Sequence, residues 1–305
     1  MFNSFKIIKI VVILSFISLS AFSSENISEE QLKSIKKISD SINLAKGEYT
    51  GSVKNHKVEL KEEYEEANLF IEQVNKIVIS MKKDLSENKK NSFLEIEKEI
   101  SDLEKILKDK EDDSKFSSLV LDIDNKLESF SGTTLKELPF SKPHIENGKK
   151  IFMQNCATCH GVNADGKGLA SVSFEVKPPS FLDTEFIREK SPYTLYRAIK
   201  NGMIGTLMPS WEYQLSIKEK WDVIEYIRSV SKEKDFDKKG KELYNKYSEK
   251  HEIKSIIDFN SSSDTSDKDF FDNLKKDNDF KSMNDNELYS IINYARDEKS
   301  IYSKS

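Results

Sequence analysis

The chain of 305 residues has few cysteines, which form disulfides, few prolines and glycines, which break helices, and few tryptophans. It contains two cysteines, six prolines, ten glycines and two tryptophans. So few cysteines cannot build a disulfide framework, which excludes the class of small disulfide-rich secreted proteins. So few prolines and glycines leave long stretches without a helix breaker. The length predicts about two domains, and the composition is that of a soluble protein rich in exposed helix.

An excess of positive charge is also absent. Lysine and arginine number 48 against 53 aspartate and glutamate residues, which gives a formal net charge of −5. Loss of an N-terminal segment that contains Lys6 and Lys9 would lower this charge by two, to −7. An acidic chain is a poor ligand for a phosphate backbone, so nucleic acid is not expected as a partner.

The only long hydrophobic run lies at the N-terminus. Residues 7–19 are mostly apolar apart from Lys9, and small residues follow around Ser23. The uninterrupted part, residues 10–22, is shorter than the about 20 residues that a transmembrane helix needs. We predict a secretory signal peptide over residues 1–23, with an uncleaved membrane anchor as the alternative, and hence a periplasmic location.

Both cysteines belong to one short motif, Cys156-Ala157-Thr158-Cys159-His160. This C-x-x-C-H arrangement is typical of c-type haem attachment, because two thiols three positions apart add to two vinyl groups of one porphyrin while the adjacent imidazole binds the iron. A thioredoxin-like pair would need a strand–helix–strand setting, and a zinc site would need two further ligands. We predict one covalently attached haem c, and no cysteine then remains for a disulfide.

The region around the motif, residues 139–234, is predicted to be a compact helical haem domain. A helix over residues 145–155 leads into the motif, a helix over residues 193–201 ends at Gly202, and a capping box at Ser216 begins the last helix. A glycine-rich turn between the cysteines and the second of these helices lets the backbone fold closely around a porphyrin.

Met208 is the predicted sixth ligand of the iron, because it stands in a Met-Pro loop bounded by glycines. A lone methionine is usually core filler, so Met153 and Met203 are rivals, and His144 is a third. Two supporting contacts are expected on weaker grounds. A carbonyl of Pro178 or Pro179 would hold the other nitrogen of His160, and Trp211 or Arg197 would contact the propionate edge.

The pattern of residues 24–138 predicts an antiparallel bundle of four helices. Apolar residues recur at spacings of three and four, a capping box at Ser28 begins the first helix, and Gly47 ends it. The short connections make neighbouring helices antiparallel. Four glutamates flank the apolar stripe of the second helix and are expected to face solvent, with iron binding as the alternative. They are Glu62, Glu63, Glu65 and Glu66.

Residues 235–305 form a charged segment with a Ser- and Asp-rich stretch, residues 260–267, that has the composition of a linker. Two of its parts repeat the haem region: residues 240–244 repeat 148–152, and residues 284–296 repeat 216–228. Ser248 and His251 stand where the two cysteines would be, so this copy cannot attach haem. We predict a haemless, degenerate cytochrome c-like helical segment, with chance similarity of lysine-rich helices as the alternative. The fold class is all-α.

Several segments are similar to a known family, the exported cytochrome region fused to bacterial high-affinity iron permeases. They are residues 161–168, 178–183, 191–196, 201–211 and 220–221, with weaker similarity upstream over residues 47–58 and 63–67. The resemblance implies a class I-like monohaem cytochrome c beside a membrane permease. This chain departs from that pattern, because it has no permease helices and no Arg-Glu-x-x-Glu motif.

We expect one-electron transfer at an iron held by His160 and Met208, since two protein ligands leave no vacant position for a substrate. The protein is thus expected to be an electron carrier rather than an enzyme. The resemblance implies a role in iron uptake beside a separately encoded permease, with membrane contact only through a partner or an uncleaved anchor. Two alternatives stay open: an electron-transfer subunit of a respiratory oxidase or dehydrogenase, and a helical iron-binding or interaction module with a redox domain.

Overall fold

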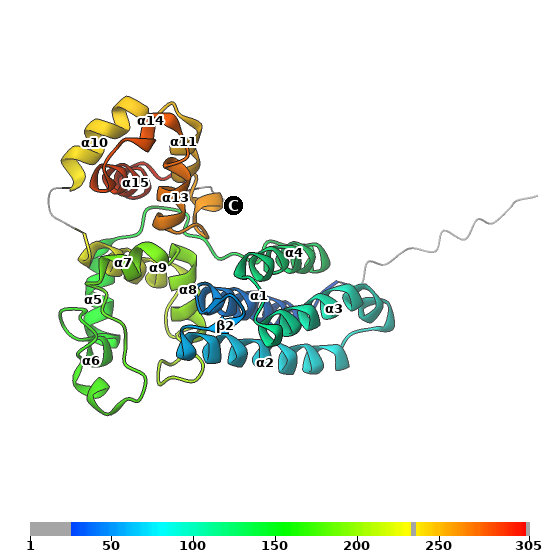
Figure 1. The fold of residues 1–305 in the computed structure, drawn as a ribbon. Helices are drawn as coiled ribbons and strands as arrows, with labels where there is room; N and C mark the ends of the chain where they lie inside the picture. Colours follow the sequence, from blue (N-terminus) through cyan, green and yellow to red (C-terminus); the bar gives the residue numbers. More distant parts are fainter. Residues whose placement is uncertain (1–25, 233–235, 303–305) are drawn as a thin grey trace, which may run out of the picture.

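The computed structural model describes residues 26–232 and 236–302, so the predicted signal peptide lies outside the described residues. The described residues form fifteen α-helices, one short 3-10 helix and a single two-stranded hairpin, which confirms the all-α prediction. Three hydrophobic cores follow one another along the chain. Figure 1 shows the corresponding parts, which we call the bundle (α1–α4), the middle lobe (α5–α9) and the C-terminal lobe (α10–α15).

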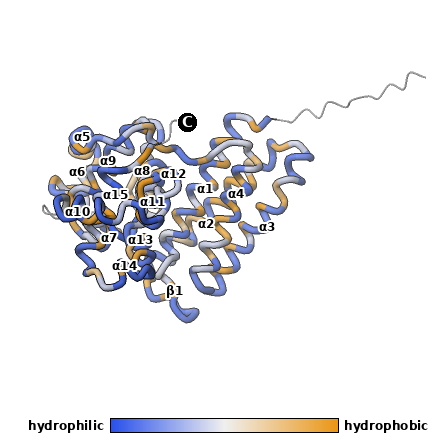
Figure 2. Tube along the Cα trace, turned by 90° about the horizontal axis from the view of Figure 1, so that it is seen from above, coloured by the Kyte–Doolittle hydropathy of each residue, from blue (hydrophilic) through white to orange (hydrophobic). Residues whose placement is uncertain are grey.

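The bundle contains the four predicted helices. They are α1 (Glu29–Tyr49), α2 (Lys61–Lys83), α3 (Glu87–Asp109) and α4 (Asp113–Ser131), and the hairpin of β1 (Val53–Lys54) and β2 (Lys57–Val58) connects the first two. Hydrophobic positions recur turn by turn along these helices (Figure 2). Ile35, Ile38 and Ile42 of α1 are fully buried, as expected for the apolar stripe of an amphipathic helix.

The prediction that Gly47 ends the first helix is wrong. The helix continues to Tyr49, whose fully buried side chain donates a hydrogen bond from its hydroxyl to the carbonyl of Glu111 at 2.6 Å. This tertiary contact holds the last turn and overrides the weak helix propensity of glycine. A Cβ atom at Gly47 would meet only the Thr194 side chain, at 3.7 Å.

The middle lobe contains the predicted helices over residues 145–155 and 193–201 and the predicted start at Ser216. Its elements are α5 (Ile145–Asn155), α6 (Ala157–His160), η1 (Leu169–Ser173), α7 (Thr184–Glu189), α8 (Pro192–Asn201) and α9 (Ile217–Val230). Helices α5 and α9 pack against each other closely at Gly148. A Cβ atom there would lie 1.8 Å from the carbonyl oxygen of Asp222, so only glycine permits this approach.

The C-terminal lobe is a packed unit of short helices around α15. Its elements are α10 (Phe236–Tyr247), α11 (His251–Ile257), α12 (Phe259–Ser262), α13 (Asp267–Leu274), α14 (Asn278–Lys281) and α15 (Asp285–Lys299). The linker-like stretch over residues 260–267 is not a linker, because Ser262, Ser263 and Ser266 are buried. Ser266 accepts from the N–H of Asp269 and so caps α13.

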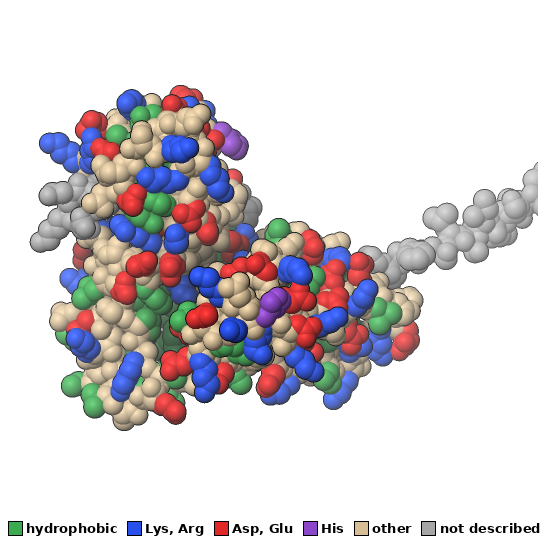
Figure 3. Space-filling view, viewed as in Figure 1, with side chains coloured by type: hydrophobic (Ala, Val, Ile, Leu, Met, Phe, Trp, Pro, Cys, Tyr) green, Lys and Arg blue, Asp and Glu red, His purple; other side chains and the backbone are tan. Residues whose placement is uncertain are grey.

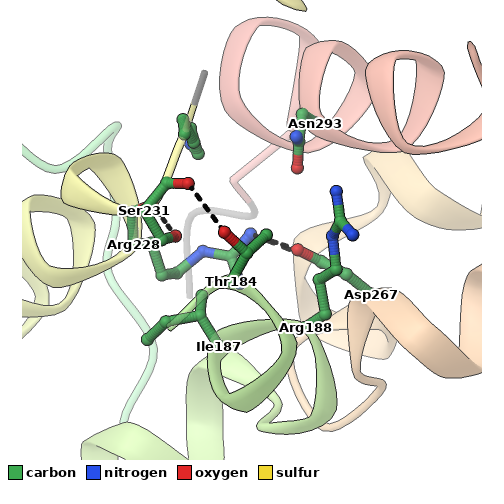
Figure 4. Close-up of a pocket in the computed structure, with 8 residues that line it drawn as sticks. Thr184, Ile187, Arg188, Arg228, Ser231, Asp267 and Asn293 are labelled. Carbon is green, nitrogen blue, oxygen red and sulfur yellow. Dashed lines mark hydrogen bonds and ion pairs between the residues drawn. The ribbon is translucent and has the colours of Figure 1, made fainter. Parts of the chain in front are cut away.

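One buried carboxylate joins the middle and C-terminal lobes. Asp267 at the start of α13 lies 3.1 Å from an Nη atom of Arg228 on α9 and 2.9 Å from Nε of Arg296 on α15. A cavity of about 20 Å³ adjoins Asp267 and Arg228, and Thr184 and Asn293 also line it (Figure 4). A cavity of this size has room for one water molecule.

Candidate haem site

The two cysteines and His160 lie together where α5 ends and the one-turn helix α6 begins. The carbonyl of Cys156 accepts hydrogen bonds from the backbone N–H groups of Cys159, at 3.1 Å, and of His160, at 2.9 Å. Both thiols are free and half-buried. Side chains three positions apart on a helical turn share one face, which is the arrangement that attachment to a single porphyrin requires.

The imidazole of His160 is held between aromatic rings and kept uncharged. Phe181 stacks on it with 4.9 Å between the ring centroids, and Phe152 lies at 6.3 Å. Burial lowers the pKa of His160 to about 4, so its ring is neutral at pH 7 and offers a lone pair to a metal. Its Nδ1 atom is buried and has no hydrogen-bond partner among the described residues. The expected bond to a carbonyl of Pro178 or Pro179 is therefore not present.

The thiol of Cys156 does not have the character of a catalytic redox cysteine. Burial, followed by the neighbouring Cys159, raises the pKa of the Cys156 thiol to about 12. Redox-active C-x-x-C pairs rely on the opposite shift, because the thiolate is the reactive form. The protonation state of Cys156 thus argues against the thioredoxin-like alternative.

The turn after the motif folds tightly over the cysteines. A Cβ atom at Gly168 would lie 2.3 Å from the carbonyl oxygen of Thr158, and one at Gly166, where φ is +74°, would lie 2.5 Å from that of Pro178. The backbone N–H of Phe181 donates to the carbonyl of Ala164 at 2.8 Å. These close approaches fix the turn and bring the ring of Phe181 to His160.

Met208 and the other candidates for the sixth ligand differ in the hydrophobic core that each side chain contacts. Met208 packs against the hydrophobic core of the middle lobe, as Cys156 does. Met203 packs instead against the core of the bundle. Met153 is 42% exposed on α5, and His144 is exposed before that helix. Of the four candidates, Met208 alone packs with the side chains that surround the motif.

The loop that carries Met208 is also fixed by hydrogen bonds. The hydroxyl of Thr206 accepts from the N–H of Met208 at 3.1 Å, and the carbonyl of Met208 accepts from the N–H of Met203 at 3.3 Å. Gly202, at a φ of +73°, faces the same carbonyl, where a Cβ atom would lie at 2.6 Å. The backbone at residues 202–208 is thus a closed turn, and its position 202 accommodates only glycine.

The bundle supports this loop from the other side. Met203 and Ile204 pack against the hydrophobic core of the bundle. A Cβ atom at Gly205 would lie 3.0 Å from a methyl carbon of Leu69 on α2. The bundle and the middle lobe therefore meet at the segment that carries the predicted sixth ligand.

The apolar surface around the motif fits a porphyrin. Leu169 is 92% exposed, Val172 is 79% exposed and Leu207 is 69% exposed. Figure 3 shows a hollow with hydrophobic side chains inside it, between the lower part of the middle lobe and the bundle. A hollow lined by hydrophobic side chains suits a large apolar group. The free thiols of Cys156 and Cys159 and the neutral imidazole of His160 form a donor set that suits haem c.

Of the two side chains expected at the propionate edge, Trp211 or Arg197, the second is occupied by other partners. Arg197 is buried, and its guanidinium lies 3.5 Å from Asp40 of the bundle and 2.8 Å from Asp264 of the C-terminal lobe. Lys200, one turn later on α8, lies 3.0 Å from Asp40 and 3.2 Å from Glu137. Neither lysine nor arginine is common in a core unless it is paired, so these two side chains join all three parts of the molecule.

Sequence reasoning missed this junction. The only signal is that Tyr193, Arg197 and Lys200 follow one another at spacings of four and three, which places the two cations on the face of a buried tyrosine. A charged residue on a buried face requires a partner. The partners themselves come from distant parts of the chain and carry no local signal.

The four glutamates of α2 divide into two exposed and two half-buried side chains, Glu62 and Glu65 being exposed. Burial, followed by Glu48 and Glu63, raises the pKa of Glu66 to about 7. Over residues 26–232 and 236–302 no three or more His, Cys, Asp or Glu side chains are grouped so that they could hold a metal ion. Over the same residues, no helix has the length and apolar character to cross a membrane.

Two parts of the chain match known families. Residues 143–227 match the family described as cytochrome c oxidase, cbb3-type, subunit III. Residues 24–134 match the iron permease-associated 4-helix bundle domain. The chain thus combines a cytochrome c domain, which implies covalently bound haem c, with a bundle of the iron permease-associated type. Both halves of the resemblance predicted from the sequence are confirmed.

Individual relatives match short stretches of this chain. A cbb3-type cytochrome c oxidase subunit CcoP of Azospirillum brasilense is 37% identical over 70 residues, which is 23% of each chain. A subunit FixP of Bradyrhizobium is 40% identical over 68 residues, covering 22% of this chain and 21% of that protein. The chain thus spans less than a quarter of the length of these relatives. A chain of the Kuenenia stuttgartiensis reducing HAO-like protein complex is 28% identical with a TM-score of 0.30, covering 38% of this chain and 60% of that one.

Proposed function

We propose that this protein is a periplasmic c-type cytochrome with one haem, which transfers single electrons in iron uptake beside a separately encoded iron permease. The observation that carries the proposal is the contact between its two recognised parts. Met203 and Ile204, from the loop of the predicted sixth ligand, pack into the core of the iron permease-associated bundle. A bundle that only stood beside the cytochrome would have no need to reach this loop.

The residues of the middle lobe are suited to electron transfer rather than to bond-making chemistry. When bound, haem supplies an iron that changes between the ferrous and ferric states. Cys156 and Cys159 would attach the porphyrin, and His160 and Met208 would be the axial ligands. A methionine thioether favours the ferrous state and so raises the reduction potential. The aromatic rings around His160 exclude water from the ligand.

The substrate side of the proposal is the ferrous ion. Oxidation of one ferrous ion releases one electron. A haem held by Cys156, Cys159, His160 and Met208 would supply the one-electron acceptor, and a redox protein partner would take the electron from this protein. The ferric ion is then available to a permease in the membrane. The protein itself forms and breaks no covalent bond in this sequence.

The test is anaerobic stopped-flow mixing of the purified, oxidised holoprotein with ferrous iron. We expect reduction of the haem with a rate that rises with the ferrous iron concentration, and a gene for an iron permease next to the gene for this protein. A haem spectrum that does not respond to ferrous iron, together with no permease gene nearby, would refute the link to iron. Sequencing the N-terminus of the exported protein tests the signal peptide at the same time.

A second candidate is an electron-transfer subunit of a respiratory oxidase. It is favoured by the match of residues 143–227 to the cbb3-type oxidase subunit family. Isolation of the native protein in mild detergent separates the two functions. A stable complex with oxidase subunits would support the second candidate, and a complex with a permease would support the first.

A further inference from the structure

A cleft of about 410 Å³ lies where the bundle meets the middle lobe. Side chains of α1 and α2 line one part of it, and the end of α8 with the turn at Glu212 and Tyr213 lines the rest. Binding sites for small molecules have volumes of about 300–1,000 Å³. The cleft is therefore large enough for a small metabolite, unlike the cavity beside Asp267.

The lining of this cleft is rich in hydrogen-bond donors. Four lysines, two serines, two side-chain amides and one tyrosine contribute to it, against three carboxylates and a single apolar residue, Ile77. Lysine has only donors, whereas a carboxylate has only acceptors when it is ionised. The complement of such a lining is a polar ligand with many acceptor oxygens.

The charges at the cleft leave two cations without a partner. Asp40 already contacts Lys200 at 3.0 Å and Arg197 at 3.5 Å, so this carboxylate is neutralised. Lys37 on α1 and Lys76 on α2, in contrast, have no ion pair or hydrogen bond among the described residues. Two unpaired ammonium groups on neighbouring helices attract a ligand with more than one negative charge.

The remaining carboxylates do not make this a site for a bare metal ion. Glu30 and Glu212 also line the cleft, so four lysines face three carboxylates in all. No group of three or more potential metal ligands occurs in the part of the chain that the structure describes. A hard cation needs several converging oxygen ligands, which this arrangement lacks.

The cleft is connected to the loop of Met208. After Met208, the hydroxyl of Ser210 donates to the carbonyl of Lys200 at 2.6 Å, and the N–H of Trp211 donates to the carbonyl of Ile199 at 3.1 Å. These bonds fasten the segment to the end of α8 and hold Glu212 at the cleft. A ligand in the cleft would thus contact the same short segment that carries the predicted axial ligand.

We propose that this cleft binds a small di- or tricarboxylate, either free or as the organic part of a ferric complex. The carboxylate groups accept hydrogen bonds from Lys37 and Lys76, and the hydroxyl of Tyr213, which also lines the cleft, offers a further donor. Binding of the carboxylate itself is independent of the proposed electron transfer. That the carboxylate carries iron rests on the proposed function and deepens it, because it places iron next to the loop of Met208.

The experiment is isothermal titration calorimetry of the holoprotein with citrate and, in a second arm, with ferric citrate. We expect saturable binding of one molecule per chain that weakens as salt is added. In the double variant Lys37→Glu/Lys76→Glu the affinity should fall by on the order of tenfold or more, because two attractions become repulsions. The milder Lys37→Gln/Lys76→Gln should lie between this variant and the natural protein.

The matched control is Lys98→Glu/Lys105→Glu, which changes the net charge by the same amount on exposed positions of α3. Binding unchanged in this control and weakened in the cleft variants supports the proposal. The proposal would be overturned if neither ligand bound saturably. It would also be overturned if Lys98→Glu/Lys105→Glu weakened binding as much as Lys37→Glu/Lys76→Glu. Binding of citrate alone identifies a free carboxylate, and binding of ferric citrate alone identifies a chelate.

The calorimetric result also separates this proposal from the proposed function. Saturable binding in a holoprotein whose haem does not respond to ferrous iron supports the carboxylate site and refutes the electron transfer from iron. Haem reduction by ferrous iron without any binding of citrate or ferric citrate refutes the cleft and leaves the proposed function intact.

Discussion

The middle lobe and the C-terminal lobe are built on the same helix pair, yet only one of them has a haem motif. In the first pair, α5 approaches α9 at Gly148, where a Cβ atom would lie 1.8 Å from the carbonyl oxygen of Asp222. In the second pair, α10 approaches α15 at Gly240, where a Cβ atom would lie 2.3 Å from that of Ser290. These four positions correspond in the sequence repeat, so the repeat coincides with the closest approach of each pair.

Aromatic contacts follow the same correspondence. Two pairs of rings link the equivalent helices at matching positions. Phe152 and Tyr226 have centroids 5.2 Å apart at 56°, and Tyr244 and Tyr294 have centroids 5.5 Å apart at 56°. Chance similarity of two lysine-rich helices does not account for contacts that agree in both partner and geometry.

The difference between the lobes lies in how each core is closed. The middle lobe leaves apolar side chains such as Leu169 and Val172 exposed around its motif. The C-terminal lobe has Ser248 and His251 at the corresponding cysteine positions, and it closes its core with its own side chains. Phe280 is fully buried and packs on Tyr247 with 5.0 Å between the ring centroids. The helix pair therefore occurs in a lobe without the haem motif, whereas the exposed apolar side chains occur in the lobe that has it.

The largest expected effect tests this difference directly. Cys156→Ser/Cys159→Ser should abolish covalent haem, because no other thiol exists to hold the porphyrin. Ser248→Ala/His251→Ala, at the equivalent positions, should leave the haem content unchanged. A pyridine-haem spectrum and the intact mass of the exported protein measure both. Two haems per chain in the natural protein, or haem that survives loss of both cysteines, would contradict the comparison.

The next effect concerns the carboxylate that joins the two lobes. Asp267→Asn leaves Arg228 and Arg296 buried without their ion-pair partner, so we expect a loss of about 3–5 kcal/mol in the free energy of unfolding. Asp264→Asn is the control, because that side chain is 26% exposed and its loss should cost less. Denaturant unfolding followed by circular dichroism measures both. An Asp267→Asn variant that is as stable as the natural protein, or that loses less than Asp264→Asn, would show that the lobes do not depend on Asp267.

The same carboxylate predicts the direction of acid sensitivity. Burial alone would raise the pKa of Asp267, but Arg228 and Arg296 hold it below its usual value. A lowered pKa in the folded protein stabilises the fold above the pKa of the unfolded carboxyl, and this contribution is lost as the pH falls through the folded value. Unfolding curves between about pH 6 and pH 2 should therefore converge for the natural protein and Asp267→Asn.

The helices were predictable because local signals determine them. Capping boxes at Ser28 and Ser216 mark two helix starts, and Gly202 marks a helix end. The end of the first helix was not predictable from Gly47, because the last turn is held by Tyr49. The hydrogen-bond partner of Tyr49 lies in the loop after α3. The stretch over residues 260–267 misled for a similar reason, since serine and aspartate are as typical of helix caps as of linkers.

The candidate site divides in the same way. The positions of Cys156, Cys159 and His160 follow from a motif within one turn, and Met208 stands out through its glycine-bounded loop. Arg197 could not be interpreted from its neighbours in sequence. Its burial depends on Asp40 and Asp264, which come from the other two parts of the molecule.

The two glycines allow a graded test of the shared helix pair. Gly148→Ala should cost about 2–3 kcal/mol, and Gly240→Ala about 1–2 kcal/mol, because each added Cβ meets a backbone carbonyl that cannot move aside. Gly47→Ala is the control, since its nearest contact at 3.7 Å leaves room and alanine favours a helix. Denaturant unfolding measures all three. A neutral Gly240→Ala would remove the main structural support for the repeat.

The smallest expected effect tests what the middle lobe has and the C-terminal lobe lacks, a ligand loop supported by the bundle. Leu69→Ala removes the methyl groups that meet Gly205 and should cost about 1 kcal/mol of stability, since the side chain is only half-buried. The near-infrared sulfur-to-iron band of the holoprotein should weaken as the loop of Met208 loosens, and Met208→Ala should abolish it. Leu94→Ala, at an exposed position of α3, should change neither quantity. A loss of stability in Leu69→Ala with an unchanged band would mean that the bundle packs on the loop without positioning the ligand, and the two lobes would then differ only in their haem motif.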